Sequence, residues 1–413
     1  MARAVRPFYL PPTLLLSQLA ALMLIRRSTG WRVSGRWTSD LGRLLRVASG
    51  ARAFSCFGFS PHPVYEVTAA CNLRCVHCHA SAGARYPGEL DTVGAIKVIE
   101  SLSTVRDFRT LVFTGGEPLV RPDIFVLTER ARDLGFEVIY ATNGVLVTDQ
   151  VAARMERAGV VGAAISLDSL SPGRHDWFRG VPGAWRRAIE GMRNVLRHHM
   201  YLQVNITVSR LNLDEFDRVV EFVDRLGAHV ILLYTFVAFG RGNEAAARLS
   251  LTPSEAAAVV KRAADLQSRA ELVIAPIGVP WYYAYLVERS GVPPAVARAF
   301  VYGCAAGRGM FYVKPNGDVW PCPFLPLRAG NAAERPAIEI WEGPVFRALR
   351  DRSRLEGACG ACRYRDVCGG CRARAYIRYG RETAPDPLCP LANGLAEGGL
   401  SQAIAVAEHA VVA

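Results

Sequence analysis

The chain has 413 residues, of which 51% are hydrophobic and 21% are charged, and its formal net charge is +12. This length allows one large core domain with smaller modules, and the composition excludes an intrinsically disordered chain. Only three of the 49 basic residues are lysines, and no run of five or more basic residues occurs. Scattered arginines without a recognition motif do not predict nucleic-acid binding, and an anionic substrate or partner fits the charge equally well.

The first predicted element is an apolar segment at residues 8–25, FYLPPTLLLSQLAALMLI, with arginines on both sides. Its length is close to the ~20 residues that cross a bilayer. Two prolines and three polar residues interrupt it, and no A-x-A cleavage site follows. We therefore expect a helix that packs on the protein or lies on a membrane surface. A spanning helix or a signal peptide is the alternative.

From residue 63 onward, short apolar runs alternate with longer amphipathic ones. Runs that are β-branched and apolar on both faces predict buried parallel strands at residues 64–69, 110–116, 137–144, 161–168, 202–208 and 230–236. Helical patterns lie between them at residues 91–104, 122–134, 148–158, 183–198 and 213–226. Gly135, Gly159 and Gly227 follow three of these patterns, as helix C-caps do.

Six βα units in a row predict an α/β fold, either a partial (β/α)6 TIM-like barrel or an open doubly wound sheet. In both folds the chemistry lies at the carboxyl ends of the strands. We expect five segments along the chain: an N-terminal extension with an apolar helix at 1–62, the βα core at 63–250, a helical connector at 251–303, a small Cys-rich module at 304–395 and a C-terminal tail at 396–413.

Eleven cysteines are unevenly distributed along the chain. Three lie in CNLRCVHC at residues 71–78, seven lie between Cys304 and Cys389, and Cys56 stands alone. Clustered C-x2-C spacings in a long chain favour metal binding over disulfides. Cys56 is interpreted as a buried thiol.

The three thiols of CNLRCVHC present a ligand set that is one short of four. Thiolates are the soft ligands that select iron–sulfur clusters or zinc. A structural zinc site takes four ligands, so zinc would need His77 or His79 to complete the set. Three thiolates on a cubane cluster instead leave one iron open, and an open iron can bind and activate a cofactor.

Further motifs stand at the ends of the next three predicted strands: TGGEP, ATNG and SLDS. The C-x3-C-x2-C motif after the first strand, followed by these three in order, resembles the radical S-adenosylmethionine (SAM) enzymes over residues 63–240. The resemblance implies a 4Fe-4S cluster whose open iron is chelated by the methionine part of SAM. One electron from the cluster would then cleave SAM to methionine and a 5′-deoxyadenosyl radical.

The resemblance also implies roles for single residues. Cys71, Cys75 and Cys78 would ligate the cluster. Gly115, Gly116 and Glu117 would hold the methionine amine by hydrogen bonds. The ribose, carboxylate or adenine would be contacted by Asn143, Ser166, Asp168 and Asn205. His77 stands where the family usually has an aromatic residue beside the adenine. For each of these polar residues, an ordinary hydrogen bond at a strand end is the alternative.

The C-terminal cysteines have a spacing that a zinc ribbon could also have. Together with the upstream barrel they resemble the SPASM domain, which holds auxiliary 4Fe-4S clusters. That domain commonly contains C-x5-C-x3-C, whereas the last gap here has two residues. The usual pairing would assign one cluster to Cys359, Cys362, Cys368 and Cys389. A second cluster would receive Cys304, Cys322 and Cys371, and the sequence shows no fourth ligand for it.

Smaller signatures point to a subfamily. HDWFRGVPGAW (175–185), FGRG (239–242), GDVWPCPFLPLRAGN (317–331) and CGGCRARAY (368–376) resemble the SPASM enzymes of alternative haem and haem d1 biosynthesis. They are also similar to enzymes that modify tungsten or molybdenum cofactors. A carboxylate-rich porphyrin would suit an arginine-rich cavity, and the candidate contacts are Arg179, Arg241, Arg372 and Arg374.

We therefore expect a radical SAM enzyme that acts on a small anionic substrate, foremost the side chain of an iron-tetrapyrrole, in a decarboxylation. The alternatives are a peptide-modifying maturase and, in another class, a non-catalytic iron–sulfur electron carrier. An electron donor such as ferredoxin or flavodoxin is expected. Iron–sulfur assembly normally occurs inside the cell, so we expect a cytoplasmic protein, with peripheral membrane contact through residues 8–25 left open.

Overall fold

The computed structural model describes residues 12–31, 61–394 and 399–405. A ten-stranded sheet runs through these residues in the order β10-β9-β8-β1-β2-β3-β4-β5-β6-β7. Its strands are β1 (His62–Thr68), β2 (Thr110–Gly115), β3 (Glu137–Thr142), β4 (Val160–Ser166), β5 (Tyr201–Val208), β6 (Val230–Thr235), β7 (Val273–Ile277), β8 (Met310–Val313), β9 (Asp318–Trp320) and β10 (Gly330–Asn331).

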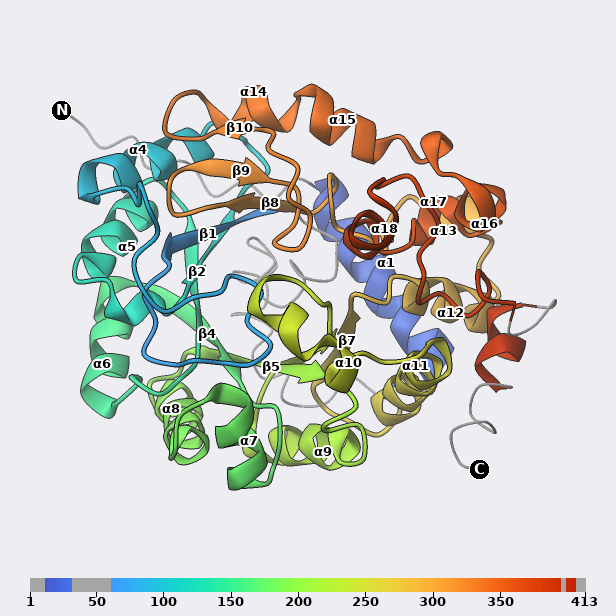
Figure 1. Ribbon diagram of the computed structural model, residues 1–413, viewed down its shortest axis with the longest axis horizontal. Helices are drawn as coiled ribbons and strands as arrows, with labels where there is room; N and C mark the ends of the chain where they lie inside the picture. The colour runs from blue at the N-terminus through green and yellow to red at the C-terminus, as the bar shows by residue number, and fades with distance from the viewer. Residues whose placement is uncertain (1–11, 32–60, 395–398, 406–413) are drawn as a thin grey trace.

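Helices surround the curved sheet, as Figure 1 shows. The α-helices are α1 (Pro12–Thr29), α4 (Thr92–Leu102), α5 (Ile124–Asp133), α6 (Asp149–Ala158), α7 (Pro172–Arg179), α8 (Ala184–Arg197), α9 (Phe216–Leu226), α10 (Ala246–Leu249), α11 (Pro253–Gln267), α12 (Trp281–Ser290), α13 (Pro294–Ala297), α14 (Ala337–Trp341), α15 (Pro344–Arg350), α16 (Gly357–Ala361), α17 (Arg365–Cys368) and α18 (Arg372–Tyr379). Three 3₁₀ helices are η2 (Pro118–Val120), η3 (Gly240–Ala245) and η4 (Arg352–Arg354).

The predicted α/β core is confirmed. All six predicted strands are present as β1 to β6, each parallel to the next along the sheet. The strands are buried on both faces, and the helices between them form the outer layer, so the core is a partial barrel. Gly159 and Gly227 end α6 and α9 in the left-handed conformation that favours glycine.

Two parts of the sheet lie outside the predicted strands. The connector at 251–303 contains β7, which pairs with β6 at one edge of the sheet. Pro276 lies within β7, and proline is tolerated on an edge strand although it argues against a strand in a sequence. At the other side, β8 pairs in parallel with β1, and β8, β9 and β10 form an antiparallel meander. The Cys-rich module thus continues the sheet of the core.

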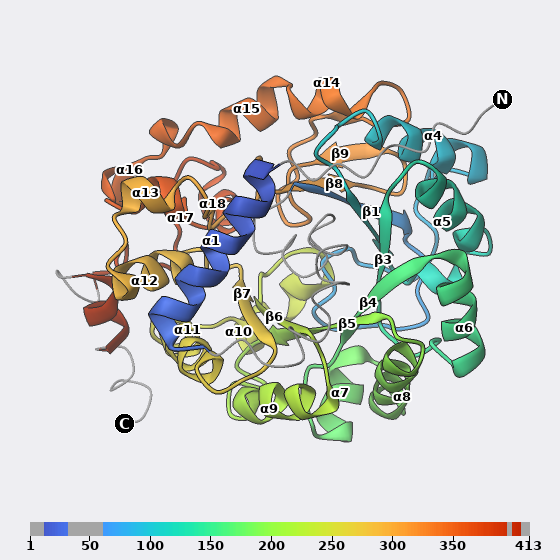
Figure 2. The same ribbon diagram turned by 180° about the vertical axis from the view of Figure 1, so that it is seen from behind.

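The predicted N-terminal helix packs on the protein. Figure 2 shows α1 beside α11 and α12, and Ala21, Leu24 and Ile25 are buried in the main core. Trp31 follows the helix and donates from Nε1 to the carbonyl of Ala270 at 3.1 Å. Among the described residues, no helix is long and apolar enough to cross a membrane. Residues 8–11 of the apolar segment and Cys56 lie outside the described residues.

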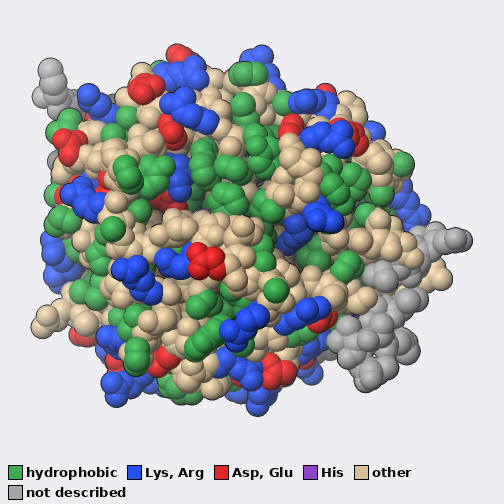
Figure 3. All heavy atoms as spheres, in the orientation of Figure 1, with side chains coloured by type: hydrophobic (Ala, Val, Ile, Leu, Met, Phe, Trp, Pro, Cys, Tyr) green, Lys and Arg blue, Asp and Glu red, His purple; other side chains and the backbone are tan. Residues whose placement is uncertain are grey.

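The basic residues do not gather into one patch on the face seen in Figure 3. Lys and Arg side chains there are separated by acidic and hydrophobic ones.

Buried carboxylates crosslink the carboxyl ends of the strands. Glu117 follows β2, and its side chain accepts hydrogen bonds from Thr142 Oγ1 at 2.7 Å and from the backbone N–H of Asn143 at 2.8 Å, both at the end of β3. It also caps η2 through the N–H of Leu119 at 3.2 Å. Burial raises the pKa of Glu117 to about 7, although these hydrogen bonds oppose the rise.

The packing of α1 can be tested by substitution. Leu24 is 3% exposed, so Leu24→Ala is expected to lower the free energy of unfolding by about 2–5 kcal/mol. Met23 is 70% exposed on the same element, and Met23→Ala should change stability by no more than about 0.5 kcal/mol. Urea unfolding followed by circular dichroism measures both variants. Equal effects would contradict a helix that packs on the protein through one face.

The pKa of Glu117 predicts a pH dependence of stability. Its pKa is higher in the folded chain than the ordinary 4.5, so its contribution to stability is fully present below about pH 4.5 and is lost as the pH rises through 7. Glu117→Gln removes this loss, so the stability of the wild type relative to this variant should fall by about 2–3 kcal/mol from pH 5 to pH 8. Urea unfolding across this range measures the difference. The exposed Glu129→Gln is the matched control, and a Glu117→Gln difference that does not change with pH would refute the assignment.

Candidate active site

A cavity lies inside the curved sheet and holds about 1540 Å³, counting its open mouth. Residues of β1 to β6 and β8 line it, together with the loop that follows β1. The structure brings most of the sequence-predicted site residues to this one cavity: Cys71, Cys75, Cys78, His77, Gly115, Gly116, Asn143, Ser166 and Asn205. The side chains of Glu117 and Asp168 are not part of its lining, because both carboxylates are engaged behind the strand ends.

Close backbone contacts between β1 and β2 form one wall of the cavity. The N–H of Gly116 donates to the carbonyl of Thr68 at 2.8 Å, and the N–H of Glu117 donates to that of Ala70 at 2.9 Å. A Cβ on Gly115 would lie 2.2 Å from the Thr68 oxygen, and one on Gly116 would lie 2.2 Å from the Ala70 oxygen. The glycines of TGGEP are therefore required for this approach, which leaves backbone exposed to a ligand.

The cysteine loop is held by the two signatures around it. Arg241 of FGRG donates from Nε to the carbonyl of Cys75 at 2.8 Å and from Nη1 to that of Ala82 at 3.1 Å. A Cβ on Gly240 would lie 2.1 Å from the carbonyl oxygen of His79, so η3 lies directly against the loop. On the other side, the N–H of Val76 donates to the carbonyl of Phe178 in α7 at 3.0 Å.

The three thiols are buried to different degrees and receive N–H donors. The N–H of Leu73 lies 3.4 Å from Cys71 Sγ, and the N–H of Ala82 lies 3.4 Å from Cys78 Sγ. Burial raises the pKa of Cys71 to about 12 and also raises that of Cys75. A bound metal stabilises thiolates, so ligation would offset the free-energy cost of forming these thiolates in a buried site.

Asp168 and Arg179 form a buried ion pair beside Cys75. Asp168 Oδ2 lies 2.6 Å from Nε and from Nη2 of Arg179, and Asp168 Oδ1 accepts from the N–H of Thr207 at 2.9 Å. Nη1 of Arg179 lies 3.9 Å from Cys75 Sγ. Burial raises the pKa of Asp168, and Arg179 opposes the rise. The Asp168 carboxylate therefore does not face the cavity. It holds the guanidinium group of Arg179 beside the sulfur of Cys75.

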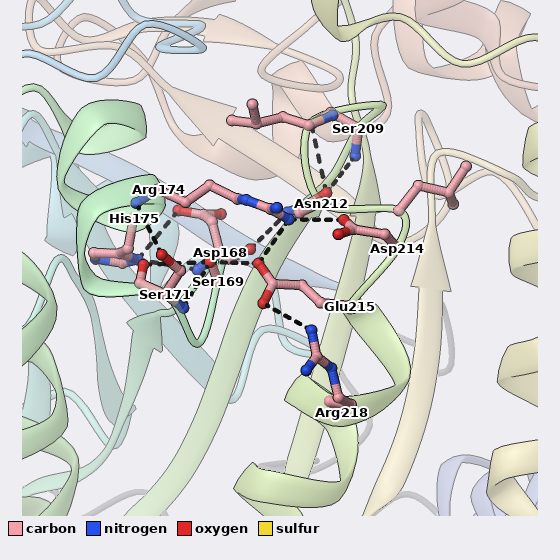
Figure 4. Close-up of polar contacts among 12 residues, drawn as sticks. Asp168, Ser169, Ser171, Arg174, His175, Ser209, Asn212, Asp214, Glu215 and Arg218 are labelled. Atoms are coloured by element: carbon pink, nitrogen blue, oxygen red, sulfur yellow. Dashed lines mark hydrogen bonds and ion pairs between the residues drawn. The ribbon is translucent and has the colours of Figure 1, made fainter.

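A polar network keeps Asp168 in this position, as Figure 4 shows. Asn212 donates from Nδ2 to the backbone carbonyl of Asp168 at 2.7 Å. Ser169 donates to Glu215, which also pairs with Arg174 at 3.1 Å. The segment after β4 is thus fixed to the segment after β5.

His77 faces the cavity as a neutral ring. It stacks on Phe178 with ring centroids 4.0 Å apart, and burial together with nearby positive charge holds the pKa of His77 well below its ordinary range. Within the described residues its Nδ1 is buried and has no hydrogen-bond partner. A buried nitrogen without a partner, beside three thiols and an open glycine wall, fits a site that binds a polar cofactor.

Sequence reasoning missed several residues that line the cavity. Gln203 donates from Nε2 to Asn205 Oδ1 at 2.8 Å, and Thr207 lies two residues further on β5. The alternation of polar residues at 203, 205 and 207 was the available signal, because alternate residues of a strand share a face. Tyr312 of β8 and Phe324 also line the cavity; no local pattern pointed to Tyr312, and Phe324 lies in the signature at 317–331 without having been named as a site residue. Of the four candidate arginines, Arg179 and Arg241 line it, whereas Arg372 and Arg374 do not.

The C-terminal cysteines gather into the two sets expected from the sequence. The four-cysteine set (Cys359, Cys362, Cys368 and Cys389) lines one small cavity beside Trp281. The three-cysteine set (Cys304, Cys322 and Cys371) lies in a second apolar cluster with Phe324 and Leu325. Within the described residues, no three His, Cys, Asp or Glu side chains lie close enough together to hold a single metal ion, so these cysteine sets suit a larger group that spans them.

Backbone N–H groups point at the sulfurs of the four-cysteine set. The N–H of Gly370 lies 3.3 Å from Cys368 Sγ, that of Tyr364 lies 3.4 Å from Cys362 Sγ, and that of Asp386 lies 3.4 Å from Cys359 Sγ. Such donors stabilise thiolates and the sulfurs of iron–sulfur groups. The donor set therefore fits an iron–sulfur cluster.

Comparison with known proteins agrees with this geometry. Residues 65–223 match the Radical SAM superfamily, and residues 304–363 match the SPASM iron–sulfur cluster-binding domain. The fold is similar to that of Streptococcus suis SuiB, crystallised with its precursor peptide SuiA, with a TM-score of 0.65 and 17% identity over 85% of this chain and 81% of that one.

Two relatives are similar over most of their length. The chain is 36% identical to the AdoMet-dependent heme synthase of Methanosarcina barkeri, over 79% of this chain and 95% of the relative. It is 32% identical to the mycofactocin maturase MftC of Mycobacterium ulcerans, over 79% of this chain and 86% of the relative. The chain therefore belongs to the radical SAM superfamily: it is a radical SAM enzyme with a C-terminal SPASM domain, and its cofactors are SAM, a 4Fe-4S cluster and auxiliary iron–sulfur clusters.

Proposed function

We propose that this enzyme modifies a carboxylate side chain of an iron-tetrapyrrole, in a decarboxylation that belongs to haem biosynthesis. The observation that carries the proposal is the 36% identity to a heme synthase over 95% of that relative, which includes both the barrel and the SPASM region. The cavity supports it, because its lining runs from the three thiols to β8 and Phe324, next to the three-cysteine set.

In this proposal, each part of the lining has a role. Cys71, Cys75 and Cys78 hold the cluster, and the backbone at Gly115 and Gly116 receives the methionine amine of SAM. The groups that face the ribose, carboxylate and adenine are His77, Asn143, Ser166 and Asn205. When bound, the cluster and SAM supply the radical that removes a hydrogen atom from the substrate.

The substrate carboxylates need a cationic partner in the same cavity. Arg241 lines the cavity while its Nε and Nη1 hold backbone carbonyls of the cysteine loop, so a carboxylate that binds its outer face would contact the loop itself. Arg179 is already neutralised by Asp168, which makes it the weaker candidate. Loss of carbon dioxide from the substrate radical leaves one electron. A cluster bound by one of the auxiliary cysteine sets accepts this electron. A ferredoxin or flavodoxin is the proposed donor to the first cluster.

A peptide-modifying maturase is the second candidate. It is favoured by the 32% identity to a mycofactocin maturase over 86% of that relative. A tungsten or molybdenum cofactor is a further candidate substrate, because the smaller sequence signatures also resemble enzymes that modify such cofactors. These candidates share the SAM chemistry and differ only in the substrate.

The substrate proposal is tested with the anaerobically purified enzyme, SAM and dithionite. With iron-coproporphyrin, we expect the porphyrin mass to fall by one carbon dioxide and two hydrogens for each modified propionate. Didecarboxysirohaem serves as the alternative tetrapyrrole. Cleavage of SAM with both tetrapyrroles unchanged in mass, and modification of a precursor peptide instead, would establish the maturase.

The ligand assignment is tested by removing the three thiols. Cys71→Ala, Cys75→Ala and Cys78→Ala together should abolish 5′-deoxyadenosine formation, because no cluster then binds SAM. The iron of the auxiliary sets should remain, as iron and sulfide analysis would show. Cys322→Ala is the matched control, since it removes a cysteine of the three-cysteine set and should leave SAM cleavage with dithionite measurable. SAM cleavage that persists in the triple variant would overturn the assignment.

A further inference from the structure

Two arginine side chains are buried between the auxiliary cysteine sets. Arg352 in η4 is 3% exposed, and Arg372 at the start of α18 is 1% exposed. Arg352 donates from Nη2 to the carbonyl of Cys304 at 3.0 Å. Arg372 points Nη2 at Cys359 Sγ, at 3.7 Å. One arginine thus touches the three-cysteine set and the other touches the four-cysteine set.

Neither arginine has a carboxylate partner within the described residues. Arg372 places Nη1 on the carbonyls of Glu382 and Ala384, at 2.6 and 2.7 Å. Arg352 keeps Nε and Nη1 buried with no hydrogen-bond partner. The nearby Arg374 differs, because it lies 3.5 Å from the carboxylate of the fully buried Asp386.

Burying a charge without a counter-charge has a desolvation free energy that a folded protein cannot offset, so buried charges are paired or neutralised. The cysteine sulfurs are anionic groups beside both arginines, since Arg372 Nη2 lies 3.7 Å from Cys359 Sγ and Arg352 lies between the carbonyl of Cys304 and Gly369, the residue after Cys368. The two guanidinium groups therefore match thiolates that carry an iron–sulfur group.

The CGGC motif makes room for both arginines. A Cβ on Gly369 would lie 2.5 Å from Cζ of Arg352, and a Cβ on Gly370 would lie 2.3 Å from Nη2 of Arg372. Both glycines also have positive φ angles, of 73° and 60°. The two glycines between Cys368 and Cys371 thus place one guanidinium group against each.

We propose that Arg352 and Arg372 are the counter-charges of the auxiliary iron–sulfur groups and raise their reduction potentials. A positive charge and an N–H donor close to the sulfurs favour the reduced form, which carries one more negative charge. Arg352 acts on both sets, and Arg372 acts on the four-cysteine set. The inference depends on the ligand sets and not on the identity of the substrate, so it stands or falls separately from the proposed function.

The test uses full-length protein in the Cys71→Ala, Cys75→Ala, Cys78→Ala background, in which only auxiliary signals remain. Iron is quantified, and the midpoint potentials are measured by redox titration with electron paramagnetic resonance. Cys322→Ala and Cys389→Ala assign each signal to its set. The pair Arg352→Lys and Arg352→Gln separates charge from shape, because both shorten the side chain and only one keeps the charge.

Arg352→Gln should lower both midpoint potentials relative to Arg352→Lys, by at least a tenfold change in the ratio of reduced to oxidised cluster, which is about 59 mV for one electron. Arg372→Gln compared with Arg372→Lys should lower only the signal of the four-cysteine set. Arg354→Gln is the matched control, since Arg354 is exposed two residues from Arg352 and its charge is screened by solvent.

Each remaining outcome decides the question. Equal potentials for the Lys and Gln variants overturn the proposal, because the charge then has no effect. Iron lost from the Gln variants but kept in the Lys variants supports it, since the thiolates then need the charge to hold the cluster. Iron lost from both variants of an arginine overturns it, because the side chain then acts through its shape.

Discussion

Burying thiolates is the constraint on which the rest of this molecule depends. Three sets of cysteines lie in the interior, and burial raises the pKa of most of their thiols. Each set needs positive charge or N–H donors to become a ligand set. The chain supplies them from backbone amides and from buried arginines: Arg179 and Arg372 point at the sulfurs of Cys75 and Cys359, and Arg352 donates to the backbone carbonyl of Cys304. Two of these arginines lie in the signature motifs, Arg179 in HDWFRGVPGAW and Arg372 in CGGCRARAY.

Contacts at the carboxyl ends of the strands bring the cysteine loop and the other lining residues together in a single cavity. Gly115 and Gly116 let β2 approach the backbone after β1, while Glu117 ties the end of β2 to that of β3. The network around Asp168 then fixes the segments after β4 and β5. Because neighbouring parallel strands end at the same edge, these short contacts fix the ends of β1 to β5 relative to the cysteine loop.

The sequence predicted what depends on local pattern. Alternating apolar runs and amphipathic helices gave all six strands of β1 to β6, whereas Pro276 concealed β7 and the pairing of β8 with β1 has no local signal. Motif spacing grouped the cysteines in the same sets in which the structure places them. It could not tell that the carboxylates of Glu117 and Asp168 turn away from the cavity, because that direction depends on partners far along the chain, Thr142 and Arg179. Arg352 carried no sequence signal, since its neighbours Cys304 and Gly369 are distant in the chain.

The arginines also explain how one chain can hold clusters with opposite tasks. The first cluster must give an electron to SAM, so a low potential suits it, and the charge of Arg179 is cancelled by Asp168 at 2.6 Å. The auxiliary clusters must take an electron in the proposed reaction, so a higher potential suits them, and Arg352 and Arg372 have no carboxylate partner within the described residues. A buried ion pair is nearly neutral at the distance of a cluster, whereas a lone buried cation is not. On this proposal, the presence or absence of one carboxylate beside each arginine sets the direction of electron flow.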